Sequence, residues 1–323
     1  MRRSAFVVAI LALAANVVPA HASSNTPTST VEKRLAAVLA KTSGAAVAIA
    51  VKNRAIVAEV DREADAYMPL HLASISKTVT AVAVLKLAQQ NRVELDRPIG
   101  SYLPELFAVG DDGKSGNNDI GEQPVSAFLN HATGLRSQNL RAVGSGLTTF
   151  GQYAAQAARS SLTGNPGSYL YANDNYVLLT KLVEVVARRP FNVAVQQLVW
   201  DQLGVPGGWL DTTTRATQVL GGAGAWVASP FGIAVLFDAL NPATPGKKLL
   251  SRAWLGYMHT RIYADEYRNG LRYRNGHWGH TGSLARVRSA AVVGKDGTVY
   301  VVLSEGARPD SSDRLFDALA RLG

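Results

Sequence analysis

Both ends of the chain carry signals for antiparallel strand pairs, and these signals leave few architectures open to it. Near the N-terminus, the apolar runs 45–51 and 55–60 flank a polar tripeptide at 52–54, which is the pattern of a β-hairpin. Near the C-terminus, the runs 288–293 and 298–304 flank a Gly-Lys-Asp-Gly turn, a second hairpin signal. Helical patterns dominate from about 78 to 250. We therefore expect an α+β fold, with an antiparallel sheet made from both chain ends and a mostly helical region inserted between them.

Two further helical patterns lie at the ends of the chain, at 30–40 and 313–322. We expect these terminal helices to cover the sheet. The sheet part then comprises about 30–77 and 251–323, the helical part about 78–250, and the whole of 23–323 is one domain with a substantial core. Clefts commonly form where two such parts meet, so we expect the functional site there.

Residues 1–22 have the composition of a secretory signal: Arg2-Arg3, an apolar run, and the cleavage pattern Ala20-His21-Ala22. A membrane anchor is the alternative, but the apolar run is shorter than the roughly 20 residues that a comfortable span needs. We therefore expect an exported protein, periplasmic or secreted, without a membrane span after signal cleavage.

The composition restricts the chemistry. The sequence contains no cysteine, which excludes disulfides, thiolate catalysis and cysteine-ligated metal. Its formal net charge is +9, so anionic cell-wall or membrane surfaces would attract it.

Arginines and aromatic residues alternate between 252 and 288, as in a nucleic-acid groove. Export argues against that partner, and we expect a solvated face, with Arg286 and Arg288 as candidates for a carboxylate contact.

The tetrapeptide Ser-Ile-Ser-Lys at 74–77 stands at the start of an apolar helical pattern that continues to about Gln90. Residues three apart share a helix face, so the Ser74 hydroxyl and the Lys77 amine are expected to meet. A buried lysine loses proton affinity and can then take the proton of a serine that attacks a carbonyl. The alternative for this short motif alone is a helix cap followed by a solvated lysine.

Two further motifs follow in the chain. Tyr171-Ala172-Asn173 comes after a Gly/Pro/Ser stretch and precedes an apolar helix at about 176–187. The triad His280-Thr281-Gly282 precedes the strand-like run 287–293, where a glycine would let a substrate backbone lie close to a strand edge.

With these three motifs in this order, the chain resembles the penicillin-recognising serine hydrolases. The resemblance spans roughly 32–322 and is nearest to the branch of class C β-lactamases, DD-carboxypeptidases, D-aminopeptidases and related esterases. It implies the β-lactamase/DD-peptidase-like form of the α+β fold. It also implies catalytic roles for Ser74 as nucleophile and for Lys77 and Tyr171 as the proton-relay pair; which of the two carries the proton stays open.

The resemblance assigns the remaining site residues to substrate binding. Asn173 would hold the substrate's amide or orient Lys77, and the backbone N–H groups of Ser74 and Ser283 would form the oxyanion hole. His280, Thr281 and Gly282 would bind the carboxylate or backbone end of the substrate. No cofactor and no metal is implied.

Several departures from the family pattern bear on the activity. Histidine at 280 replaces the usual lysine of β-lactamases, which favours a DD-peptidase or a D-amino-acid peptidase or esterase; a protonated His280 would make carboxylate binding pH-dependent. Ala285-Arg286 stands where relatives often have Pro-Gly, so the shape of that loop is open. The chain lacks the E-x-x-L-N segment of class A β-lactamases and the G-x-S-x-G elbow of α/β-hydrolases. A metal at His277 and His280 is a remote alternative.

We therefore expect an exported serine hydrolase that acts through an acyl-enzyme on Ser74. The first candidate is a D-alanyl-D-alanine carboxypeptidase or D-amino-acid peptidase or esterase. A class C-like β-lactamase is the alternative, and a non-catalytic penicillin- or wall-binding module is more remote. The expected partner is a small-molecule or peptidyl substrate of the D-Ala-D-Ala, β-lactam or ester type, with peptidoglycan as a further candidate and no nucleic acid.

Overall fold

The computed structural model describes residues 29–109, 113, 115–137, 149–306 and 311–323. The expected signal segment 1–22 lies outside these residues. None of the helices in the described ranges combines the length and the apolar character that a membrane span requires.

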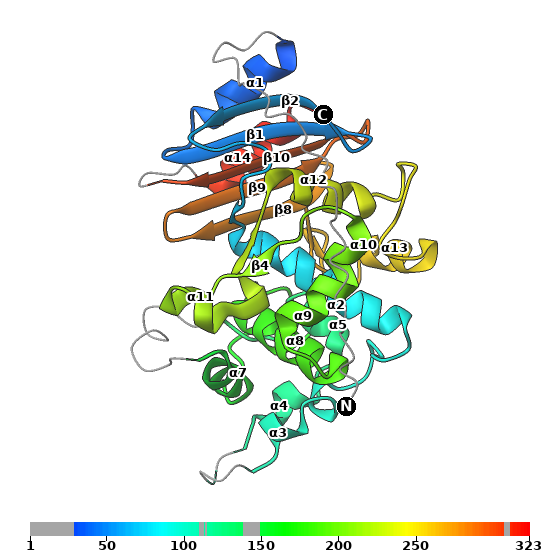
Figure 1. Ribbon diagram of the computed structural model, residues 1–323. Coiled ribbons are helices and arrows are strands. Elements are labelled where there is room, and N and C mark those ends of the chain that lie inside the picture. The colour runs from blue at the N-terminus through cyan, green and yellow to red at the C-terminus, as the bar shows by residue number, and fades with distance from the viewer. Residues whose placement is uncertain (1–28, 110–112, 114, 138–148, 307–310) are drawn as a thin grey trace, which may run out of the picture.

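A seven-stranded sheet built from both ends of the chain forms one part of the molecule (Figure 1). Its strand order is β2-β1-β10-β9-β8-β7-β6, and every neighbouring pair is antiparallel. The strands are β1 (Ala45–Lys52), β2 (Ala55–Arg62), β6 (Tyr267–Arg268), β7 (Leu271–Arg274), β8 (His277–Leu284), β9 (Val287–Val293) and β10 (Val299–Glu305). The two ends of the chain meet where β1 pairs with β10, with Ala45 opposite Glu305 and Val51 opposite Val299. The expected α+β fold, with both chain ends in one sheet, is confirmed.

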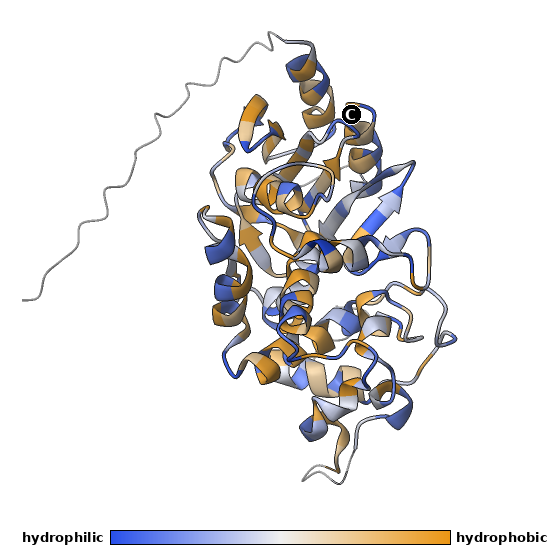
Figure 2. Ribbon diagram, turned by 90° about the vertical axis from the view of Figure 1, so that its right-hand side faces the viewer, coloured by the Kyte–Doolittle hydropathy of each residue, from blue (hydrophilic) through white to orange (hydrophobic). Residues whose placement is uncertain are grey.

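The inner strands β1, β9 and β10 are buried on both faces, because apolar residues alternate between the two faces along each strand. On β1, Val47 and Ile49 face the core that lies toward the helical part. Ala46 and Ala48 face the second core, beneath the terminal helices α1 (Thr30–Leu39) and α14 (Ser312–Ala320). Because successive strand residues point to opposite faces, a continuous apolar run such as 45–51 is required here. Figure 2 shows the hydrophobic residues concentrated on the strands and on the helices packed against them.

The helical part lies below the sheet in Figure 1, on the side of β8. Its helices are α2 (Ser76–Gln89), α3 (Pro104–Phe107), α4 (Asn118–Gly121), α5 (Val125–Leu129), α7 (Phe150–Ala158), α8 (Asn173–Ala187), α9 (Phe191–Val195), α10 (Asp201–Leu203) and α11 (Arg215–Leu220). Helix α12 (Pro230–Ala239) belongs to the stretch expected to be helical, yet it packs on β1, β9 and β10 of the sheet. Helix α13 (Arg252–His259) follows it.

A second, three-stranded sheet was not expected from the sequence. It consists of β3 (Leu70–His71), β5 (Trp226–Ala228) and β4 (Trp209–Leu210), in that order. Such strands of two or three residues are too short to show an alternating pattern. This sheet positions the site, because β3 leads directly into the turn that carries Ser74.

The β6–β7 and β7–β8 hairpins also escaped the sequence reasoning, although the chain contains a signal for each. Asn269-Gly270 and Asn275-Gly276 form the two-residue turns, and all four residues have positive φ angles. Such Asn-Gly pairs suit type I′ turns, which require φ > 0 at both central positions.

Candidate active site

Ser74 lies in a single turn of 3₁₀-helix, Ala73–Ile75, directly before α2. The preceding Ala73 is buried and has a φ of +46°, a left-handed conformation that is uncommon for a residue with a side chain. Strained backbone of this kind is often found at functional sites. Gly282 of β8 packs against the same turn, since a Cβ on Gly282 would lie 2.9 Å from Ser74 N and 2.3 Å from Leu72 O. The glycine therefore lets β8 approach the Ser74 backbone.

Lys77 is fully buried in the first turn of α2. Its Nζ donates to Ser74 Oγ at 3.1 Å, to Asn173 Oδ1 at 2.8 Å and to the Ala223 carbonyl at 2.6 Å. Burial lowers the pKa of Lys77 to about 7, and the nearby Asp174 opposes this shift. A substantial fraction of Lys77 is therefore a neutral amine at neutral pH, beside the hydroxyl that it would deprotonate.

Tyr171 lies on the other side of Ser74. Its ring centroid is 5.1 Å from Lys77 Nζ. Burial raises the pKa of Tyr171 far above the usual range for a phenol, although a hydrogen bond with Ser74 opposes this shift. The phenol therefore keeps its proton at neutral pH, whereas the amine of Lys77 titrates there.

Asn173 is the first residue of α8, so this helix begins two residues after Tyr171. Its N–H donates to Ser137 Oγ at 2.6 Å, while its side-chain oxygen accepts from Lys77. Of the two expected roles, the orientation of Lys77 is the one that this contact can provide.

The third motif runs along β8, whose edge is open at the site. On one side of β8, strand β7 pairs only with the β8 residues from His277 to Gly279. On the other side, β9 pairs with β8 as far as Leu284. The edge beyond Gly279 is therefore free of a strand partner within the described part of the chain. A narrow cleft between this edge and the helical part is lined by Ala73, Ser74, Asn173, Leu220, Ala223, Gly224, Ser283 and Leu284. Three of the expected site residues thus share one cleft.

His280 lies behind this cleft. It is 0% exposed, its Nδ1 contacts the Thr281 carbonyl at 2.7 Å, and its Nε2 contacts the Tyr267 hydroxyl at 3.1 Å. Because a carbonyl can only accept, Nδ1 carries the proton and Nε2 accepts from Tyr267. Burial, with smaller contributions from Arg272 and Lys77, holds the pKa of His280 well below its usual value. In this conformation the ring is neutral and has no access to a substrate carboxylate.

Arg272 is a residue that the sequence reasoning missed. Its Nη1 donates to Thr281 Oγ1 at 2.5 Å and to Asp313 Oδ1 at 2.6 Å. Burial raises the pKa of both Tyr169 and Tyr171, and the charge of Arg272 opposes this shift. It therefore lies beside the H-T-G motif and near the phenol. The expected candidate Arg288 instead donates to the carbonyls of Ala285 and Val287. No local pattern distinguishes Arg272 from the other arginines of its segment.

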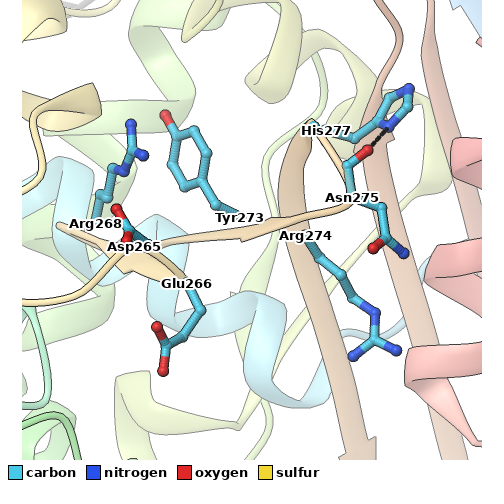
Figure 3. A pocket seen from close by; sticks show the side chains of 8 residues that line it. Asp265, Glu266, Arg268, Tyr273, Arg274, Asn275 and His277 are labelled. Atoms are coloured by element: carbon cyan, nitrogen blue, oxygen red, sulfur yellow. Dashed lines mark hydrogen bonds between the residues drawn. The ribbon is translucent and has the colours of Figure 1, made fainter.

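The structure offers no support for a metal at the two histidines of β8. His277 and His280 are three apart on a strand and point to opposite faces, and the described residues contain no group of three metal-ligating side chains. A hollow of about 390 Å³ lies at the β7–β8 hairpin (Figure 3) and shares no lining residue with the cleft at Ser74. Two of its charged residues form ion pairs: Asp265 pairs with Arg261, and Arg274 with Asp317.

Comparison with known proteins gives a consistent result. The β-lactamase family model matches residues 31–322. Among solved structures, a D-stereospecific amidohydrolase from Streptomyces sp. is 23% identical, with a TM-score of 0.69 over 89% of this chain and 97% of its own.

Two other structures are similar in fold at lower identity. The D-amino acid amidase from Ochrobactrum anthropi SV3, in complex with D-phenylalanine, is 16% identical with a TM-score of 0.72, over 90% of this chain and 96% of its own. The octameric penicillin-binding protein homologue from Pyrococcus abyssi is 18% identical with a TM-score of 0.70, over 90% of this chain and 76% of its own. With the family model matching nearly the whole described chain, this protein belongs to the β-lactamase family of serine hydrolases.

Proposed function

We propose that this protein is an exported hydrolase of D-amino-acid amides and peptides, acting through an acyl-enzyme on Ser74. The observation that carries the proposal is the set of contacts around Lys77, whose buried amine meets the Ser74 hydroxyl and two oxygens that can only accept. A neutral amine has two N–H groups and one lone pair. If Asn173 Oδ1 and the Ala223 carbonyl take the two N–H groups, the lone pair is directed at Ser74.

In the acylation step, Ser74 Oγ attacks the substrate carbonyl and its proton passes to Lys77. The N–H groups of Ser74 and Ser283 stabilise the oxyanion that forms. As the intermediate collapses, the bond to the leaving nitrogen breaks, and that nitrogen takes a proton from the Lys77–Tyr171 pair. Water then attacks the acyl carbon, gives its proton to the pair, and releases the acid product with the Ser74 hydroxyl restored.

Two observations favour an amide or peptide of a D-amino acid as the substrate. The similar structures include a D-stereospecific amidohydrolase and a D-amino acid amidase. The open edge of β8 also allows an extended backbone to pair beside Ser74, since a free strand edge presents unpaired main-chain groups. A substrate carboxylate would be held by Thr281 and Arg272 rather than by the buried His280.

A substrate panel tests this proposal. Purified protein lacking residues 1–22 would be assayed with D-phenylalanine amide, its L enantiomer, a D-Ala-D-Ala peptide, a simple ester and nitrocefin, with Ser74→Ala as control. We expect turnover of the D-amide or the D,D-peptide, at least tenfold preference for D over L, and no turnover by Ser74→Ala. Fast turnover of nitrocefin alone would instead identify a β-lactamase. Inertness toward the whole panel would favour a non-catalytic binding module.

A further inference from the structure

His131 holds the chain on both sides of Tyr171. Its carbonyl accepts from Leu170 N–H at 2.8 Å, and its Nδ1 accepts from Ala172 N–H at 3.2 Å. The two donors are the residues immediately before and after Tyr171. The imidazole also packs on the phenol itself, with ring centroids 4.2 Å apart. Backbone and side chain of one residue therefore fix the position of Tyr171 relative to α5.

The hydrogen bonds of the ring define its protonation state. Nδ1 receives a backbone N–H and lies 3.2 Å from Asn175 Nδ2, whose amide orientation is set by the hydrogen bond from Thr133 Oγ1 to Asn175 Oδ1 at 2.7 Å. An atom that accepts from two donors carries no proton, so the ring proton lies on Nε2. Burial, together with the charges of Lys77 and Arg272, lowers the pKa of His131, and the neutral form is maintained.

The backbone at His131 has an uncommon conformation and lies next to a contact with the sheet. The φ angle of His131 is +54°, a left-handed conformation in which only glycine, asparagine and a few other residues are common. The neighbouring Asn130 forms a reciprocal pair with Asn269 in the β6–β7 turn: Asn130 Nδ2 donates to Asn269 Oδ1 at 2.8 Å, and Asn269 N–H donates to Asn130 Oδ1 at 2.9 Å. His131 thereby connects this hairpin to the Tyr171 segment.

We propose that His131 is a positioning residue for acylation, which holds the Tyr171 phenol at Ser74 through the peptide groups on either side of it. The inference rests on the proposed function, in which Tyr171 helps to protonate the leaving nitrogen. His131 is not among the described residues that line the cleft, and we infer that its effect passes through Tyr171. Displacements of about 1 Å in a catalytic group lower rates by about a hundredfold.

Two variants distinguish the contribution of the Nδ1 acceptor of His131 from the contribution of its ring. His131→Asn retains an acceptor near the Nδ1 position and tolerates a left-handed backbone, whereas His131→Phe retains a ring without an acceptor. We expect His131→Phe to lower kcat for D-phenylalanine amide by about tenfold to a hundredfold, with KM within about twofold. His131→Asn should retain kcat within about threefold. Should His131→Phe melt below the assay temperature, His131→Gln, whose acceptor reaches the Nε2 position instead, replaces it with the same expectation.

A double-mutant cycle with Tyr171→Phe identifies the path of the effect. If His131 acts through Tyr171, His131→Phe causes no further loss of kcat in the Tyr171→Phe background. Both variants should also lose less activity on a D-phenylalanine p-nitrophenyl ester than on the amide, because nitrophenolate leaves without a proton. Equal losses of kcat in the two backgrounds, or a His131→Phe variant as fast as wild type, would overturn the inference. An unimpaired Tyr171→Phe would instead reject the relay role in the proposed function, and with it this inference.

Discussion

At the scale of single residues, the Lys77 amine has three partners of two kinds. Asn173 Oδ1 and the Ala223 carbonyl accept hydrogen bonds, whereas Ser74 Oγ can both donate and accept. A neutral Lys77 amine can therefore still donate to Asn173 and Ala223. Its lone pair can then accept the proton of the Ser74 hydroxyl. Because Tyr171 keeps its proton at neutral pH, we propose that Lys77 is the base.

This assignment predicts an acid limb in the pH profile. Burial lowers the pKa of Lys77 to about 7, so kcat/KM for acylation should rise as the pH increases through that value and the base loses its proton. Asn173→Asp places a carboxylate 2.8 Å from Nζ if the geometry is kept. An opposite charge at that distance favours the ammonium form, and the limb should move to higher pH by about 1–3 units.

The matched control is Asn173→Thr, which removes the amide without adding charge. Its acid limb should stay near pH 7, although its kcat/KM should be lower than that of the wild type. Steady-state kinetics from pH 5 to 10 provide the measurement. An unshifted limb in a folded Asn173→Asp variant would show that the titrating group is not Lys77.

Arg272 gives a second prediction at this scale. If Arg272 and Thr281 hold a substrate carboxylate, Arg272→Met should raise KM for a D-Ala-D-Ala peptide by about tenfold or more, as expected for one lost charged hydrogen bond. KM for D-phenylalanine amide, which lacks that carboxylate, should change little. Arg274→Met is the control, because Arg274 pairs with the same α14 carboxylates without contacting Thr281. Equal KM changes for both substrates would rule out the contact.

At the scale of secondary-structure elements, the long strands and both terminal helices were predictable because each has a strong local pattern. The runs 45–51 and 298–304 became central strands, and 30–40 became α1 to within one residue. Helix α8 begins at Asn173 rather than at the expected 176, so Asn173 itself lies in the first helical turn. The three-stranded sheet was not predictable, since its pairing depends on tertiary contacts between β3, β5 and β4.

The β8–β9 loop shows what Ala285-Arg286 does in place of the usual Pro-Gly. Leu284 pairs with Val287, so the loop has two residues, and Ala285 has a φ of +44°. A positive φ at the first central position is typical of a type II′ turn, which prefers glycine there. Ala285→Gly should therefore stabilise the fold by about 1 kcal/mol.

Urea denaturation measures this effect, with Arg286→Gly as the control. Because no positive φ is found at Arg286, glycine at that position should be neutral or destabilising. A loss of stability in Ala285→Gly would mean that the Ala285 side chain contributes more than its backbone strain costs.

At the scale of the whole molecule, His71 joins three segments that lie far apart in the chain. Its Nδ1 contacts Glu305 of β10 at 2.9 Å, and its Nε2 contacts Asp211, just after β4, at 3.0 Å. Carboxylates on both nitrogens require both to donate, so the ring is an imidazolium. His71 thus ties the large sheet to the small one, three residues before Ser74. The hydrogen bond to Glu305 contributes most to raising the pKa of His71 to about 9, and burial opposes it.

The folded-state pKa of His71 lies above its usual 6.5, which sets the sign of a stability prediction. The stabilisation is fully present below about pH 6.5 and is lost as the pH rises toward 9. After allowance for solvent screening, we expect the free energy of unfolding to fall by about 1–2 kcal/mol between pH 6.5 and 9.5 on account of this group.

His71→Gln should lose most of this alkaline dependence in urea titrations at the two pH values. His277→Gln should retain it, because the partners of His277 are main-chain oxygens of Asn275 and Gly323, not Asp or Glu side chains. A His71→Gln variant with the wild-type pH dependence would contradict the role of this cluster.

The candidate site was predictable as far as its motifs are local. The motifs placed Ser74 and Lys77 on one helix face and located Asn173 and Ser283. The fold brings Ser74, Asn173 and Ser283 to one cleft, and Lys77 donates hydrogen bonds to Ser74 and Asn173. Sequence could not show that His280 is fully buried and does not line that cleft, because the burial of a strand residue depends on which elements pack against its face. Arg272 and His71 were missed for the same reason, since their partners come from distant segments.

The central claim is that Ser74 is the nucleophile, and acid-quenched intact-mass spectrometry tests it most directly. The mature protein would be mixed with a penicillin, and in parallel with a D-phenylalanine p-nitrophenyl ester, and sampled over time alongside Ser74→Ala. The account predicts a single adduct of the acyl mass on the wild type with at least one of these reagents, mapping to Ser74 and absent from Ser74→Ala. An adduct at another residue, or substrate turnover that persists in folded Ser74→Ala, would contradict it.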